Sequence, residues 1–121
     1  MRSVLETAMV LSLVAACGSD RVADEPPQPP DVCETSFLDY TGFGEPFILD
    51  WCAGCHTSTL PAEMRQDSPI DVNFDDRTAT VPWVERIRIR ATGASPTMPP
   101  AGGPSDEERA LLAEWIDCGA R

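Results

Sequence analysis

The most informative segment of this chain is Cys52-Ala53-Gly54-Cys55-His56. Two thiols separated by two residues, with a histidine directly after the second, form the C-x-x-C-H pattern of covalent c-type haem attachment. Each thiol can add to one vinyl group of the same porphyrin, and the histidine that follows can bind the iron. Ala53 and Gly54 are small enough for the backbone to approach the ring edge. We therefore predict one covalent haem c, attached at Cys52 and Cys55, with His56 as an iron ligand.

A second iron ligand is expected in the loop at residues 93–104 (GASPTMPPAGGP). Its three glycines and four prolines exclude regular structure, and they surround Met98. A methionine fixed by neighbouring prolines differs from a core methionine, which is usually a flexible filler. Ligation by histidine and methionine raises the potential of cytochromes c. We predict Met98 as the sixth ligand, because the other methionines are Met1 and Met9 near the N-terminus and Met64 close to His56.

Residues 45–51 (EPFILDW) are predicted to form a short helix that leads into the haem motif. Phe47, Ile48 and Trp51 fall on one helical face. Pro46 suits a first helical turn, where its missing N–H has no partner to lose. We expect this face to pack against the cofactor and the core.

Residues 105–118 carry the clearest helix signal. Ser105 and Glu108 have the spacing of a capping box, and acidic residues suit the N-terminal end of the helix dipole. Gly119 is placed to end the helix. We expect the apolar stripe to pack on the 45–51 helix; it consists of Leu111, Leu112, Trp115 and Ile116.

Residues 57–80 are rich in proline and polar side chains, and we predict mostly irregular chain around one edge of the haem. Val72 and Phe74 alternate with polar neighbours, which favours a brief strand.

Residues 81–92 have two competing patterns. The apolar spacing is helical, but Arg-Ile-Arg-Ile-Arg at 86–90 alternates as in a strand. Thr80 as an N-cap and Pro82 in the first turn favour the helix, which we predict. The three arginines should form a solvated face, and one of them is a candidate partner for a haem propionate.

The composition predicts one small, strongly acidic domain. The chain has 121 residues, 20 acidic side chains and 9 basic ones, all arginine, giving a net charge of −11. This charge argues against nucleic acid as a partner, because phosphate binding relies on basic residues. A redox protein with a basic docking patch would be attracted to such a surface. We expect a monomer.

Residues 1–16 have the organisation of an export signal. The apolar run at 7–16 is too short to span a bilayer and has the length of a signal-peptide core. It ends in Val14-Ala15-Ala16-Cys17, which resembles the lipobox of bacterial lipoproteins and implies lipidation of Cys17. Gly18 follows the cysteine, so the resemblance favours the outer membrane over the inner one. The alternative is an ordinary secretory signal with an incidental cysteine.

The remaining segments follow from this assignment. Residues 17–32 are predicted to be a lipidated cysteine and a proline-rich tether, and residues 33–121 a folded domain. With Cys17 lipidated and two thiols on the haem, Cys33 and Cys118 are the only pair left. In an exported domain we expect them to form a disulfide; two free thiols are the alternative.

The CAGCH motif, the later Met-Pro-Pro at 98–100 and the capped C-terminal helix together resemble a class I-like monohaem cytochrome c, in the form found in small lipoproteins of high-GC bacteria. The resemblance covers residues 33–121. It implies a mainly α fold, with three to four helices around one covalently bound haem, long irregular loops and one exposed haem edge.

Carried over position by position, the resemblance makes Cys52 and Cys55 the thioether residues, His56 the proximal ligand and Met98 the distal ligand. The chain departs from the family in having no lysine, the residue through which many members dock. The glycine–aromatic pattern of the family's first helix is shifted here to Gly44 and Phe47.

The leading functional hypothesis is a membrane-tethered carrier of single electrons outside the cytoplasm, with no catalytic residue. If Met98 does not bind the iron, a haem peroxidase or gas sensor is the alternative. A third class lacks haem: Cys52, Cys55 and His56 would bind zinc with Cys33 or Cys118, or the first two would form a redox dithiol.

Overall fold

The computed structural model describes residues 31–121, which are mainly helical and contain no strand. The predicted export signal, the predicted lipidation site at Cys17 and most of the predicted tether lie outside the described residues. Within the described part, no helix has the length and apolar character needed to cross a membrane. The α-helices are α1 (Val32–Thr35), α2 (Glu45–Trp51), α3 (Arg77–Thr80), α4 (Val84–Ala91) and α5 (Asp106–Asp117).

The helix predicted over 45–51 is confirmed as α2, with Pro46 in its first turn. A π-helical turn, Tyr40–Gly44, runs directly into it and begins where the Asp39 carboxylate accepts the Gly42 N–H at 2.6 Å. Phe47 and Ile48 are buried in the core, so the predicted apolar face is the one that packs. The helix ends at the first cysteine of the haem motif.

The helix predicted over 81–92 is present, but it begins one turn earlier than expected. Helix α3, a 3₁₀ turn at Val81–Trp83 and α4 follow one another without a break. Thr80 is therefore not an N-cap, and its side chain is buried inside the helical segment. The cap is Asp76, whose carboxylate accepts the Ala79 N–H at 2.8 Å. Asp and Thr both cap well, and the extended backbone of Asp76 decides between them.

The brief strand predicted around Val72 and Phe74 is wrong. The Phe74 N–H donates to the His56 carbonyl at 2.8 Å, but within residues 31–121 no ladder of such bonds forms. Phe74 is buried, whereas Val72 is half-buried and faces the haem motif. The alternation of apolar and polar residues at 71–75 arises because one side of an irregular segment packs against the core. We call residues 57–76 the 57–76 loop. The one helical element that it contains is a short 3₁₀ turn at Ala62–Met64.

Helix α5 is confirmed together with both of its end signals. The Glu108 N–H donates to Ser105 Oγ at 3.2 Å, and the Ser105 N–H donates to the Glu108 carboxylate at 2.7 Å. Gly119 follows the helix with φ +89°, a conformation that favours glycine. The buried residues on the inner face of α5 are Arg109, Leu112, Trp115 and Ile116.

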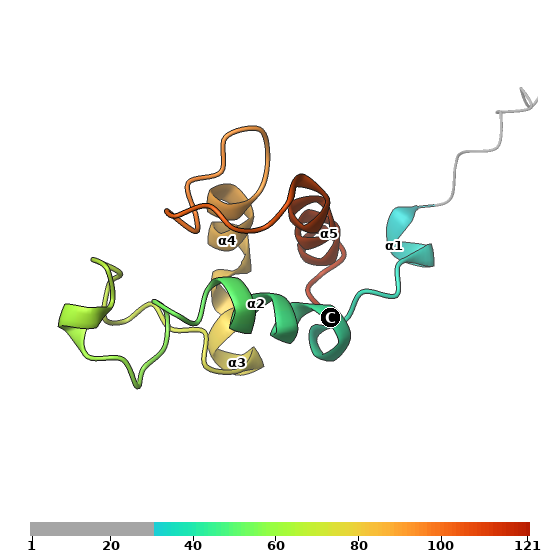
Figure 1. Cartoon of the computed structure of the whole chain (residues 1–121). Coiled ribbons are helices and arrows are strands. Elements are labelled where there is room, and N and C mark those ends of the chain that lie inside the picture. The colour runs from blue at the N-terminus through green and yellow to red at the C-terminus, as the bar shows by residue number, and fades with distance from the viewer. Residues whose placement is uncertain (1–30) are drawn as a thin grey trace, which may run out of the picture.

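Helix α5 lies beside α4 and also contacts the Tyr40–Gly44 turn that leads into α2 (Figure 1). Trp115 packs so closely on Gly44 that a Cβ there would lie 2.5 Å from the indole. Phe47 and Ile48 join the same core cluster. The predicted packing of α5 on the 45–51 helix is therefore confirmed in part, because the main neighbour of α5 is α4.

The two ends of the domain are fastened together, and the C-terminus lies beside the 40–44 turn (Figure 1). Cys33 and Cys118 form a disulfide with their Cα atoms 5.2 Å apart. The Arg121 guanidinium donates to the carbonyls of Cys33 (3.0 Å) and Ser36 (2.6 Å). A disulfide between residues 85 positions apart stabilises the fold by about 4 kcal/mol through loop closure.

Candidate functional site

A cavity of about 570 Å³ lies between α2, α4 and two loops. Cofactor and ligand sites typically have volumes of about 300–1,000 Å³. Its walls are mainly apolar and include Phe47, Trp51, Val72, Phe74 and Ile87. The four predicted haem-binding residues also line it, namely Cys52, Cys55, His56 and Met98.

The Cys-x-x-Cys-His segment folds into a tight turn at the end of α2. The Cys52 carbonyl accepts the N–H groups of both Cys55 (3.1 Å) and His56 (3.0 Å). This turn brings both thiols, which are free, and the imidazole to the same cavity wall. A Cβ on Gly54 would meet nothing within 4 Å, so open space lies next to the turn.

His56 is held through one ring nitrogen. Nδ1 lies 3.1 Å from the Val72 carbonyl oxygen and 2.8 Å from Ser68 Oγ. Phe74 stacks on the imidazole, with ring centroids 4.8 Å apart. A histidine whose Nδ1–H donates to a carbonyl keeps the lone pair of Nε2 for a metal. Burial lowers the pKa of His56, and the Arg65 charge lowers it further against the opposing hydrogen bond to Val72. Both causes that lower the pKa favour the neutral ring that a metal requires.

Arg65 is a residue that sequence reasoning missed. It is completely buried, and among the described residues it contacts no carboxylate. Its guanidinium donates instead to backbone carbonyls, those of Thr57, Ser68 (3.3 Å), Pro69 (2.8 Å) and Val72 (2.9 Å). The available signal was its isolation, because it is the only basic residue between Arg21 and Arg77 in an acidic stretch.

Met98 lies in an irregular loop, as predicted, and a second buried arginine holds its backbone. The Met98 N–H donates to the Arg90 carbonyl at 2.9 Å, at the end of α4. Arg109 of α5 donates to the Met98 carbonyl (2.9 Å) and also to those of Ala91 (2.6 Å) and Pro104 (3.2 Å). Sequence reasoning missed Arg109 as well, because it treated α5 as an apolar face.

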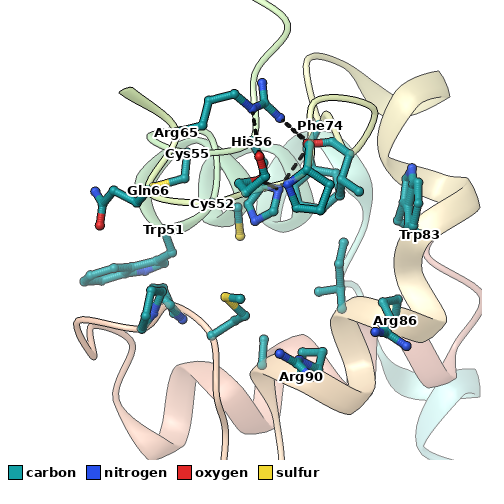
Figure 2. Close-up of a pocket in the computed structure, with 18 of the residues that line it drawn as sticks. Trp51, Cys52, Cys55, His56, Arg65, Gln66, Phe74, Trp83, Arg86 and Arg90 are labelled. Atoms are coloured by element: carbon teal, nitrogen blue, oxygen red, sulfur yellow. Dashed lines mark hydrogen bonds between the residues drawn. The ribbon is translucent and has the colours of Figure 1, made fainter. Parts of the chain in front are cut away.

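The arginines of α4 divide into two groups. Arg88 pairs with Asp117 of α5, with its Nε 2.9 Å from the carboxylate. Arg86 and Arg90 are exposed, and Figure 2 shows them across the cavity from Cys52 and His56. The solvated face predicted for the three side chains is thus interrupted by the pair to α5, and two cations remain at the cavity.

The zinc hypothesis loses its fourth ligand. Cys33 and Cys118 are joined to each other, so neither offers a thiolate. Within residues 31–121, no group of three or more His, Cys, Asp or Glu side chains is arranged to hold a metal ion. The donors that remain near His56 are two thiols and, elsewhere on the wall, a thioether.

The redox-dithiol hypothesis is also disfavoured. A redox dithiol needs a thiol of lowered pKa, but burial raises the pKa of the Cys52 thiol to about 12. The described part of the chain also contains no strand, and hence no βαβ unit around the motif. Cys52 is therefore a half-buried thiol that stays protonated at neutral pH.

Comparison of the chain with protein-family models, with curated proteins and with solved structures gives no significant match.

Proposed function

We propose that this chain is a monohaem c-type cytochrome, similar to class I, which carries single electrons between redox partners outside the cytoplasm. One observation carries the proposal: the Cys-x-x-Cys-His turn and Met98 line the same mainly apolar cavity. His56 and Met98 are 42 residues apart in the sequence (98 minus 56). Neither the Cys-x-x-Cys-His motif nor the methionine alone requires that the two lie on the wall of one cavity.

The residues around the cavity fit a haem. Cys52 and Cys55 would hold it covalently, His56 would bind the iron through Nε2, and Met98 is the candidate for the opposite side. Arg86 and Arg90 supply exposed positive charge at the cavity, suited to the carboxylates that such a cofactor carries. The apolar walls would keep water from the iron and raise its potential.

A bound haem supplies one-electron chemistry, with iron passing between the ferric and ferrous states. The chain needs only to attach it, fix both axial ligands and exclude water. His56 is the sole histidine, so a general base built on histidine would compete with its use as a ligand. For this reason we propose a carrier and not an enzyme.

The partner we propose is a redox protein with a basic docking patch, because the chain has a net charge of −11. The lipid anchor at Cys17 would hold the domain at a membrane surface, with the outer membrane favoured. The basic docking partner and the lipid anchor are both inferred from the sequence alone.

The decisive experiment is to express the full chain in a host with cytochrome c maturation machinery. We expect a pyridine haemochrome spectrum typical of two thioether bonds and one haem per chain. The control replaces both thiols, Cys52→Ala and Cys55→Ala, and should export without a covalent chromophore. A wild-type chain without covalent haem in this host would refute the proposal.

The sixth ligand is tested separately. Wild-type ferric protein should show the sulfur-to-iron charge-transfer band and resist carbon monoxide when reduced. Met98→Leu should lose the band and bind carbon monoxide readily. A wild type that already binds carbon monoxide would favour the gas sensor or peroxidase instead.

A further inference from the structure

We propose that Arg65 is a positioning residue for His56, acting through the Val72 carbonyl and the Ser68 hydroxyl group. This inference rests on the proposed function in that His56 is taken as the iron ligand. Arg65 would set the orientation of the imidazole, the nitrogen that carries its proton and the electron density on that ring.

The first support is a shared acceptor. The Val72 carbonyl oxygen lies 2.9 Å from Arg65 Nη2 and 3.1 Å from His56 Nδ1. A carbonyl oxygen has two lone pairs, so both N–H groups can donate to it at once. The bond from Arg65 fixes the position of this oxygen, and with it the direction in which the imidazole Nδ1–H must point. Arg65 therefore influences the ring without touching it.

The second support is the way Arg65 shapes the chain from 65 to 72. Its Nε and Nη2 atoms donate to the Ser68 and Pro69 carbonyls, at 3.3 and 2.8 Å. Gln66 and Asp67, which follow it directly, both adopt positive φ, 52° and 66°. Two consecutive non-glycine residues in this region are strained and persist only when their surroundings hold them. The guanidinium supplies that hold, and it presents Ser68 Oγ 2.8 Å from His56 Nδ1.

The third support is burial without an acidic partner. The Arg65 guanidinium is completely buried, and within residues 31–121 it contacts no carboxylate. Burying a charge in this way has a high desolvation cost, which its hydrogen bonds to four carbonyls offset. A loop clamp alone would not require a permanent charge next to the acceptor of His56. The placement of that charge beside a candidate iron ligand is what points to a role in setting its properties.

The expected consequences have a definite sign. Loss of Arg65 removes a buried positive charge from beside the imidazole, and this loss favours ferric over ferrous iron. We expect Arg65→Gln to shift the ferrous-to-ferric ratio at fixed potential by tenfold toward ferric, which corresponds to 59 mV for one electron.

The test uses the fact that His56 is the only histidine. Full-length chain labelled with ¹⁵N-histidine gives one pair of imidazole nitrogen signals. In the reduced holoprotein, Nδ1–H should exchange with solvent at least tenfold faster in Arg65→Gln than in wild type. In haem-free full-length chain, wild type should carry its proton on Nδ1, and Arg65→Gln should move it toward Nε2.

Two further variants separate positioning from other roles. Arg65→Lys keeps the charge but loses the planar fork, so it should retain the potential better than Arg65→Gln while leaving Nδ1–H exchange fast. Arg109→Gln removes the other buried arginine; in the haem-free full-length chain, where Met98 has no iron to bind, it should lower stability while leaving the His56 tautomer as in wild type. Ser68→Ala, a smaller change in the same loop, should also speed Nδ1–H exchange.

The outcomes are distinct. Unchanged His56 exchange and tautomer in folded Arg65→Lys and Arg65→Gln would overturn this inference and leave the haem proposal intact. Equal changes in the Arg109→Gln signals would also overturn it, because the effect would then be one of general loosening. A wild-type chain that acquires no covalent haem in the maturation host, but whose His56 tautomer still depends on Arg65, would refute the proposed function and retain the inference about Arg65.

Discussion

The two loops that border the cavity are each tied to a buried arginine, but the origins of the two arginines differ. Arg65 belongs to the 57–76 loop, and its hydrogen-bond acceptors are three to eight residues away in the sequence. Arg109 belongs to α5 and reaches into the second loop, residues 93–104, and across to Ala91, which is 18 residues away. The 57–76 loop is thus held by an arginine of its own, whereas the 93–104 loop is held by an arginine of helix α5.

The two sides of the proposed haem site therefore depend on different parts of the fold. The His56 side is fixed by local chain and by Phe74. The Met98 side needs α5 to be docked on α4. Loss of tertiary packing should therefore release Met98 before it releases His56, and the predictions below test that order.

The largest effect is expected for Trp115→Ala. Trp115 is fully buried and packs on Gly44, and truncating such a side chain costs about 3–5 kcal/mol of unfolding free energy. Denaturant unfolding measures the loss. Native-state hydrogen exchange should show the Met98 N–H, bonded to Arg90, losing more protection than the Phe74 N–H, bonded to His56.

The converse variant is Phe74→Ala, which removes the ring stacked on His56. It should reverse the order of the two amides. Equal loss of protection at both amides in both variants would mean that the two loops unfold as one unit and that the contrast between them is wrong.

An intermediate effect is expected for Gly103→Ala. A Cβ at this position would lie 2.6 Å from the Trp51 ring, and the residue has φ +138°. Overpacking of this kind costs about 1–3 kcal/mol. Since Trp51 precedes Cys52 and Gly103 belongs to the 93–104 loop, the variant should weaken the sulfur-to-iron band while leaving covalent attachment unchanged.

The matched control is Gly102→Ala, with φ +82° and nothing within 4 Å of its Cβ. It carries only backbone strain, about 1 kcal/mol. A band weakened equally by both changes would show that strain, and not contact with Trp51, fixes the loop.

A smaller effect is expected at the helix caps. Ser105→Ala removes the capping box of α5 and should cost about 1 kcal/mol. Asp76→Ala removes the cap of α3 and should cost a similar amount. In the holoprotein, only the first should loosen Met98, as reported by faster exchange of its N–H. Loosening by Asp76→Ala to the same degree would contradict the dependence on α5.

The smallest effect concerns pH and Asp75. This exposed carboxylate accepts hydrogen bonds from Thr57 Oγ1 (2.6 Å) and the Ser58 N–H (2.9 Å), which lower its pKa below the ordinary 3.8. A lowered folded-state pKa means that its contribution to stability is present above about pH 4 and is lost as the pH falls through the folded-state pKa. Carboxyl-carbon NMR titration should therefore give a midpoint below 3.8, and Thr57→Ala should raise it. A midpoint that Thr57→Ala leaves unchanged would show that this bond contributes nothing to the 57–76 loop.

The predictable parts of the fold are those in which local chemistry and tertiary packing agree. Ser105 and Glu108 could be identified as a capping box because both partners lie within one helical turn. The start of the α3–α4 segment was misplaced because Thr80 and Asp76 are both good caps, and burial of Thr80 decides against it. The strand predicted at Val72 and Phe74 is wrong because alternating apolar and polar residues show only that one side of the chain is buried. They do not show that a second strand lies alongside to pair with it.

The candidate site was predictable as a set of residues and unpredictable as an arrangement. Cys52, Cys55 and His56 form a motif whose spacing follows from covalent chemistry. Arg65 and Arg109 left no comparable signal, because a buried arginine satisfied by carbonyls has the same sequence appearance as a solvated one.

The chemical groups available to this protein and most of its helix ends can be read from short segments of the chain, because both depend on residues a few positions apart. The same reading leaves Cys33 and Cys118 as the remaining pair of thiols. The position of Met98 on the same cavity wall as His56, and the two buried guanidinium groups that hold the loops around them, become visible only in the folded protein. These contacts depend on the docking of α5 and on the path of the 57–76 loop. Both are fixed by long-range packing, which the spacing of neighbouring residues in the sequence does not reveal.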